Sequence, residues 1–104
     1  MIYKVRARLR PGTEAALFAR LTDGTVAAQK PDGAEIVASM ERAVVTDAGE
    51  VVWSETCYCA TPLAHERATV LDHHFDEIET EEIGACETCE GRPLMAHLRA
   101  VAVG

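Results

Sequence analysis

The sequence predicts a single α+β domain in which two helices cover one face of a four-stranded antiparallel sheet. Three observations predict this fold class. The opening segment alternates between apolar and basic residues, a helical repeat follows each of two strand-like stretches, and a glutamate-rich alternating segment comes late in the chain. Because 104 residues is the size of one domain, we assign residues 1–104 to that domain.

The first element is a half-buried strand at residues 2–10, with apolar side chains on one face and basic ones on the other. Pro11-Gly12 breaks this strand. The apolar spacing over Thr13–Leu21 then predicts a helix with a threonine N-cap, and a second helical piece is expected at 25–30.

A β-hairpin is expected in the middle of the chain. Pro31-Asp32-Gly33 has the composition of a turn, and the segments 35–45 and 50–60 are β-branched in places. The four residues between them, 46–49, end in glycine, which is typical of a hairpin loop.

The second half of the domain is expected to be helix, strand and a short closing helix. Thr61-Pro62 is a typical helix start, and that helix runs to His73-His74. A strand follows at 75–83, and a short helix at 93–101 ends the chain. The order β-α-β-β-α-β is the ferredoxin-like sandwich, with strand order 4-1-3-2 and the first strand central.

Charge and hydropathy exclude several partners. The net charge of −7 would repel nucleic acid, and no apolar run approaches the roughly 20 residues that span a bilayer. The N-terminus alternates and lacks the apolar segment of a signal peptide, so we expect a cytoplasmic protein. The core is built mostly from small aliphatic residues, which favours a homodimer that buries more surface.

Several loose motifs resemble the dimeric α+β barrel superfamily over residues 2–83. They are Arg10-Pro11-Gly12 before an acidic helix start, Val52-Trp53-Ser54-Glu55 before a helix that holds His65, and His74-Phe75 at the end of that helix. The resemblance implies a homodimer whose sheets face each other and a small pocket between sheet and helices. It implies no particular reaction, because members differ widely in chemistry.

The basic face of the first strand requires partners. Glu77, Glu79 and Glu81 alternate, so they share one face of the fourth strand and are expected opposite the basic residues at positions 4, 6 and 8. Two interpretations follow: a charge ladder that fixes strand register, or an anion site formed by the arginines that remain.

Glu55 is the first candidate catalytic residue, and it shares a strand face with Trp53. If that face is open, Glu55 pairs with an arginine. If it faces the helices, burial raises its pKa and makes it a candidate general base. His65 and His74 are further candidates because the resemblance places them in the pocket, although a lone helical histidine is commonly a cap or a surface residue.

The four cysteines form a C-x-C and C-x-x-C set: Cys57, Cys59, Cys86 and Cys89. Four thiolates at such spacings suit tetrahedral zinc, and the predicted strand order brings both pairs toward Met1. They are equally compatible with apolar core packing, while a redox pair is disfavoured because Glu87 and Glu90 would raise the thiol pKa values.

Three functional hypotheses remain. The first is a protein that binds or acts on a small molecule by proton transfer, in a pocket lined by Trp53, Glu55, His65 and His74. The second is a non-enzymatic zinc-binding module that uses the four cysteines. The third is a structural homodimer without chemistry.

Overall fold

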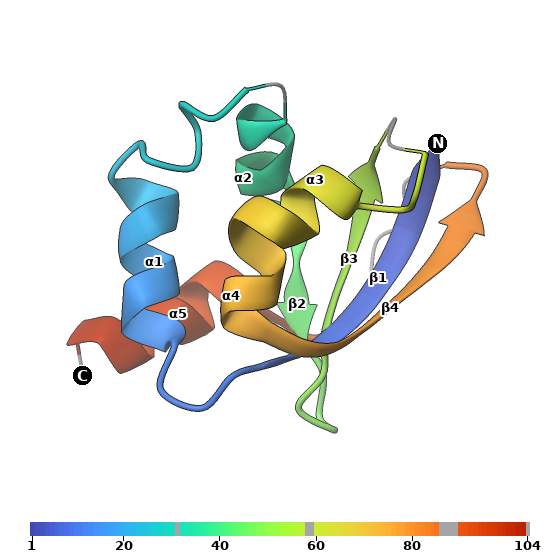
Figure 1. Cartoon of the computed structure of the whole chain (residues 1–104). Helices are drawn as coiled ribbons and strands as arrows, with labels where there is room; N and C mark the ends of the chain where they lie inside the picture. Colours follow the sequence, from blue (N-terminus) through green and yellow to red (C-terminus); the bar gives the residue numbers. More distant parts are fainter. Residues whose placement is uncertain (31, 58–59, 86–89, 104) are drawn as a thin grey trace.

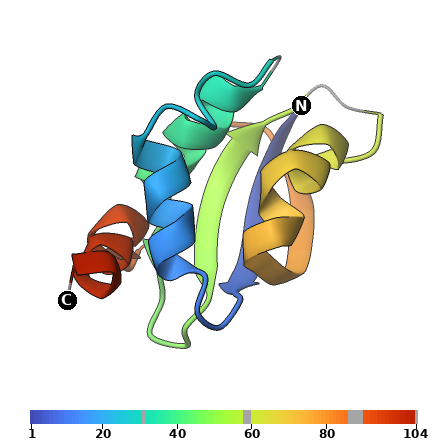
Figure 2. The same ribbon diagram turned by 60° about the vertical axis from the view of Figure 1, so that its left-hand side comes forward.

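The computed structural model describes residues 1–30, 32–57, 60–85 and 90–103. Helices lie on one face of a five-stranded antiparallel sheet, as Figures 1 and 2 show. The elements in chain order are β1 (Ile2–Leu9), α1 (Glu14–Thr22), α2 (Gly33–Arg42), β2 (Val44–Val45), β3 (Val51–Thr56), α3 (Ala64–Glu66), η1 (Arg67–Leu71), α4 (Asp72–His74), β4 (Phe75–Ile83), β5 (Arg92–Pro93) and α5 (Leu94–Val103). This α+β arrangement is compatible with a ferredoxin-like fold.

The strand order is β4-β1-β3-β2-β5, so the predicted order 4-1-3-2 is confirmed and a short fifth strand extends it. β1 is central, as its alternation predicts. Tyr3, Val5 and Ala7 are buried toward the helices, while Arg6 and Arg8 on the other face are exposed. The apolar half of β1 therefore fixes which face of the sheet the helices cover.

The prediction of a strand over residues 35–45 is wrong for most of its length. Residues Gly33–Arg42 form α2, and only Val44–Val45 pair as a strand. Ile36 and Met40 are four residues apart and both fully buried, which is the spacing of one helical face. Here the helical period outweighed the β-branched composition.

Gly33 explains where α2 begins. A Cβ atom at this position would lie 2.1 Å from the carbonyl oxygen of Val26, so the chain preceding α2 packs directly on its first turn. That preceding chain, expected as a helical piece at 25–30, consists of turns in its described residues. Only glycine permits this close approach of two backbones.

The hairpin between β2 and β3 is confirmed. Val45 pairs with Val51, and Thr46 donates its backbone N–H to the Glu50 carbonyl at 2.8 Å. Gly49 has φ +82°, the left-handed conformation that a glycine in this loop supplies.

The helix predicted from Thr61 to His74 is present from Ala64, in three parts. α3 is one α-helical turn, η1 is a π-helical segment, and α4 returns to α-helix before β4. Leu63 precedes it with φ 56°, a left-handed conformation that is uncommon for leucine. The closing helix is confirmed as α5, which packs beside α1 (Figure 2).

The core lies between the sheet and the helices. Trp53 and Phe75 are its largest buried side chains, with ring centroids 5.2 Å apart at an interplanar angle of 46°. In the described part of the chain, no helix combines the length and apolar character that crossing a membrane requires.

Candidate functional site

The structure places Glu55 on the face of β3 that is covered by helices. Strand register sets this, because Glu55 lies opposite Tyr3 and Trp53 lies opposite Val5, both on the buried face of β1. Glu55 is 0% exposed. A carboxyl group in the core of so small a domain is uncommon, and it calls for a functional or structural explanation.

Only one oxygen of the Glu55 carboxyl has a hydrogen-bond donor among the described residues. The indole Nε1 of Trp53 donates to Oε1 at 2.8 Å, while Oε2 is buried without a partner there. Burial raises the pKa of Glu55 to about 8, although the Trp53 hydrogen bond opposes this shift. Near neutral pH both the acid and the carboxylate forms are therefore populated.

Three further carboxylates add to the raised pKa of Glu55 by repulsion: Glu66, Glu35 and Asp32, in decreasing order of effect. They come from α3, from α2 and from the residue that precedes α2. Together with Glu55 they form a group that we call the acidic cluster. It lies where β3, the start of α2 and α3 converge (Figure 1).

Glu66 is the second buried carboxylate of the acidic cluster. Its Oε2 accepts a hydrogen bond from the Cys57 thiol, with sulfur and oxygen 3.6 Å apart, and both side chains are buried. Cys57 directly follows β3, and its backbone N–H donates to the Met1 carbonyl at 2.8 Å. The end of β3 therefore positions a thiol and a carboxyl beside each other.

Glu35 ties α2 to the end of β3. Its Oε2 accepts the Thr56 backbone N–H at 2.9 Å and an Arg42 guanidinium N–H at 3.1 Å. Arg42 also donates to the Ser54 carbonyl at 2.7 Å. The charge of Glu35 is thus balanced within its own helix, and it acts as an anchor for the strand that carries Glu55.

His65 stands at the solvent-facing side of the acidic cluster. Its Nδ1 donates to Asp32 Oδ2 at 2.7 Å and so links α3 to the N-terminal end of α2. The His65 side chain is 39% exposed and that of Asp32 is 13% exposed, whereas Glu55 is fully buried. The three residues therefore lie at successively greater depth from the surface.

The backbone around Glu66 is irregular on both sides. Leu63 has the left-handed conformation three residues before it, and the π-helical segment η1 begins directly after it. Left-handed non-glycine residues and π-helical turns are both enriched at functional sites. This coincidence with a buried carboxyl supports a site at this end of the helix.

His74 belongs to a different group of residues. It is nine residues beyond His65, at the opposite end of the segment formed by α3, η1 and α4. Arg20 donates to its Nε2 at 3.0 Å, so Nδ1 carries the hydrogen that is donated to Thr13 at 2.5 Å. Burial and the Arg20 charge lower the pKa of His74 to about 4, so it is neutral at pH 7.

Of the predicted metal ligands, only Cys57 falls within the described residues. Cys59, Cys86 and Cys89 lie outside them, so the four-cysteine zinc site stays a prediction. Within residues 1–30, 32–57, 60–85 and 90–103, no group of three or more metal-ligating side chains is arranged to hold an ion.

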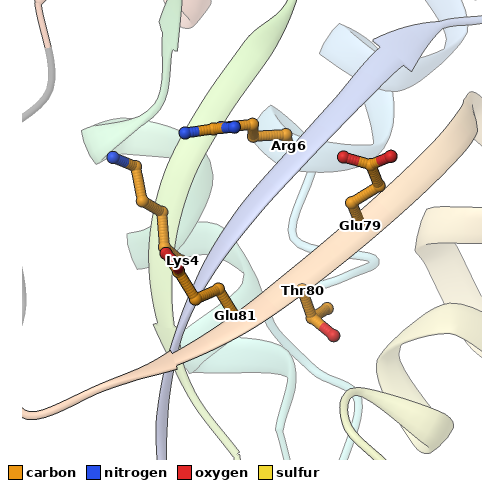
Figure 3. Close-up of a pocket in the computed structure, with 5 residues that line it drawn as sticks. All are labelled: Lys4, Arg6, Glu79, Thr80 and Glu81. Atoms are coloured by element: carbon orange, nitrogen blue, oxygen red, sulfur yellow. The ribbon is translucent and has the colours of Figure 1, made fainter.

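The charge ladder on the open face has the predicted register at two of its three pairs, whereas Arg8 lies opposite Asp76 instead of Glu77. Lys4 lies opposite Glu81 and Arg6 opposite Glu79, and these four residues with Thr80 line a shallow hollow of about 200 Å³ (Figure 3). A bulge in β4 follows, and at it Glu77 has φ 54° and pairs with Arg8 at 3.3 Å. The anion-site interpretation of this face stays a prediction.

Sequence reasoning missed Asp32, Glu35 and Glu66 as members of the site. The sequence predicts Asp32 as a turn residue and places Glu35 in a segment expected to be a strand. The signal for Glu66 is its position next to His65, in the helix that comes after the strand carrying Glu55. The burial of Glu66 could not be predicted, because the sequence does not show which side of this helix faces the sheet.

Comparison with known proteins gives no family for this chain: no family model, no curated protein and no solved structure matches it.

Proposed function

We propose that the protein binds a small organic molecule at the acidic cluster and exchanges a proton with it through Glu55. The observation that carries this proposal is the fully buried Glu55 carboxyl, with Oε1 held by Trp53 and a pKa near 8. A group whose pKa lies near the operating pH is best suited to general acid–base catalysis.

The proton step uses the free lone pairs of Oε2. In its ionised form Glu55 removes a proton from a substrate C–H, N–H or O–H group, and in its protonated form it returns that proton to the product. Trp53 fixes the orientation of the carboxyl through Oε1 and leaves Oε2 for the reacting group. The Asp32–His65 pair lies on the exposed side of the acidic cluster, and we propose that protons reach Glu55 from this side between turnovers.

A neutral probe tests this proposal without knowledge of the natural substrate. 5-Nitrobenzisoxazole opens when a base removes its ring C–H proton: the N–O bond breaks and a cyanophenolate forms. We expect a protein-dependent rate that rises with pH to a plateau, with a midpoint of about 8, as the pKa of Glu55 requires. Glu55→Gln should reduce the rate at least about tenfold relative to the parent protein.

The matched control is Asp47→Asn, which removes an exposed carboxylate from the loop between β2 and β3 and should leave the rate unchanged. Equal rates for the parent protein and Glu55→Gln would refute proton transfer by Glu55.

We also propose that the open sheet face pairs with a second copy of the chain. The alternating charges of β1 and β4 support this, because a two-fold related copy could present acidic side chains to the basic residues Lys4 and Arg6. Light scattering at micromolar concentration should give twice the mass of one chain. A monomer mass at that concentration would contradict the proposal.

A further inference from the structure

Two buried carboxylate oxygens in the acidic cluster lack a hydrogen-bond donor among the described residues: Oε2 of Glu55 and Oδ1 of Asp32. The second oxygen of each group is occupied, by Trp53 and by His65 respectively. Buried acceptors in folded proteins nearly always have a donor, and an exception requires an explanation. The site has acceptors in excess and is short of donors.

The charge around the Glu55 carboxyl is negative. Asp32, Glu35 and Glu66 all repel negative charge at Glu55. The Arg42 guanidinium is engaged by Glu35, and the His65 Nδ1–H is engaged by Asp32. An anionic ligand would be repelled by this negative charge. A cation that carries N–H groups would be attracted by the charge and would donate hydrogen bonds to the acceptor oxygens.

An aromatic pair lies beside the Glu55 carboxyl. Trp53, which holds Glu55, packs against Phe75 with ring centroids 5.2 Å apart. An ammonium group is attracted to aromatic rings, and the hydrocarbon part of an amine would be compatible with these apolar surroundings.

Building on the proposed small-molecule function, we infer that the ligand is an organic amine bound as its ammonium ion, with N–H groups that donate to Glu55 Oε2 and Asp32 Oδ1. An ammonium group has three hydrogen-bond donors and no acceptor, so it suits a site in which two buried oxygens lack a donor among the described residues. His65, on the exposed side of Asp32, marks the side from which the amine enters.

Titration with benzylammonium chloride, followed by NMR of the backbone amides and the Trp53 indole N–H, tests this inference. Benzyl alcohol is the matched neutral probe, since it keeps the ring and replaces the ammonium with a hydroxyl. We expect the amine to bind at least about tenfold more tightly than the alcohol, with the largest shifts at Trp53 and the start of α2.

Two variants localise the binding. Glu55→Gln and Asp32→Asn should each weaken amine binding at least about tenfold, while Asp47→Asn in the exposed loop between β2 and β3 should leave it unchanged. Circular dichroism establishes that each variant is folded, and either folded variant alone suffices for the test. Equal affinity for amine and alcohol, or amine binding that is insensitive to the folded variant, would overturn the inference.

The two proposals fail separately. Amine binding without benzisoxazole opening would contradict proton transfer and leave the amine site standing. Benzisoxazole opening that depends on Glu55, without preference for the amine, would contradict the amine inference alone.

Discussion

The Nε1 of Trp53 donates a 2.8 Å hydrogen bond to Oε1 of Glu55, two residues further along the same buried strand face. Trp53 is the single tryptophan of the chain, so its fluorescence reports on one site. Loss of the Glu55 proton places a negative charge directly against the indole. The pair therefore provides a spectroscopic measure of the state of the buried carboxyl.

We predict that Trp53 emission titrates with a midpoint of about 8, the pKa that burial gives to Glu55. The measurement is fluorescence of the folded protein as a function of pH. Glu55→Gln keeps an oxygen acceptor for the indole and removes the charge, so its emission should not change over this range. A midpoint near the ordinary glutamate value of 4.5 would contradict the raised pKa.

Stability should fall as pH rises through the same range. Glu55 has a pKa of about 8 when folded and an ordinary value of 4.5, so between these values the folded protein holds a proton that the unfolded chain has lost. The contribution of the Glu55 proton to the free energy of unfolding is complete below about pH 4.5 and is lost by about pH 8. Its upper bound is about 5 kcal/mol.

Urea unfolding of the parent protein and of Glu55→Gln across this pH range measures that contribution. The free energy of unfolding of the variant should depend less on pH. Parallel pH profiles for the two proteins would show that Glu55 does not titrate in the core.

His74 should make the folded protein less stable as pH falls, the opposite of the effect of Glu55. Its pKa is lowered from 6.5 to about 4, so the unfolded chain takes up a proton first as pH falls. The contribution is intact above about pH 6.5 and disappears as pH falls toward about 4. NMR titration of the His74 ring protons should therefore show no change near pH 6.5.

Arg20→Met removes both the charge and the donor to His74 Nε2. The pKa of His74 should rise toward its ordinary value, because Arg20 is second only to burial as a cause of the shift. The variant should also lose about 1–2 kcal/mol at pH 7, since His74 and the Thr69 carbonyl both lose a donor. An unchanged titration of His74 would contradict this role of Arg20.

The sheet was predictable because β1 carries an unambiguous pattern. Strict alternation identified its buried face, and the glutamates of β4 fixed the pairing of Lys4 with Glu81 and of Arg6 with Glu79. α2 was not predictable in the same way, because its short apolar stretch satisfies both a strand and a helix. Tertiary packing favours the helix here. Ile36 and Met40 are buried in the core together, and Gly33 allows the Val26 backbone to approach closely.

The candidate site was predictable in part. The alternation of side chains along a strand placed Glu55 on the same face as Trp53. That this face is buried follows from the pairing of Glu55 with Tyr3, which a single sequence does not reveal. Glu66 was hidden for another reason. The π-helical segment after it changes the helical register, so a regular 3.6-residue pattern does not describe which residues of that helix face the sheet.

Glu35 should contribute more to stability than the exposed ion pairs of the sheet. Its Oε2 accepts the Thr56 backbone N–H and an Arg42 N–H, so it holds α2 to the end of β3. Glu35→Ala leaves both donors without this acceptor, and we expect a loss of about 2–3 kcal/mol in the free energy of unfolding. The measurement is urea denaturation at pH 7.

The matched comparison is Arg8→Ala, which removes an ion pair to Glu77 whose side chains are 48% and 73% exposed. Such pairs contribute about 1 kcal/mol or less because water screens them, so Arg8→Ala should be the milder change. Equal losses in the two variants would show that Glu35 is a surface charge only. A larger loss in Glu35→Ala would establish that the strand carrying Glu55 is anchored by a helix that the sequence alone did not predict.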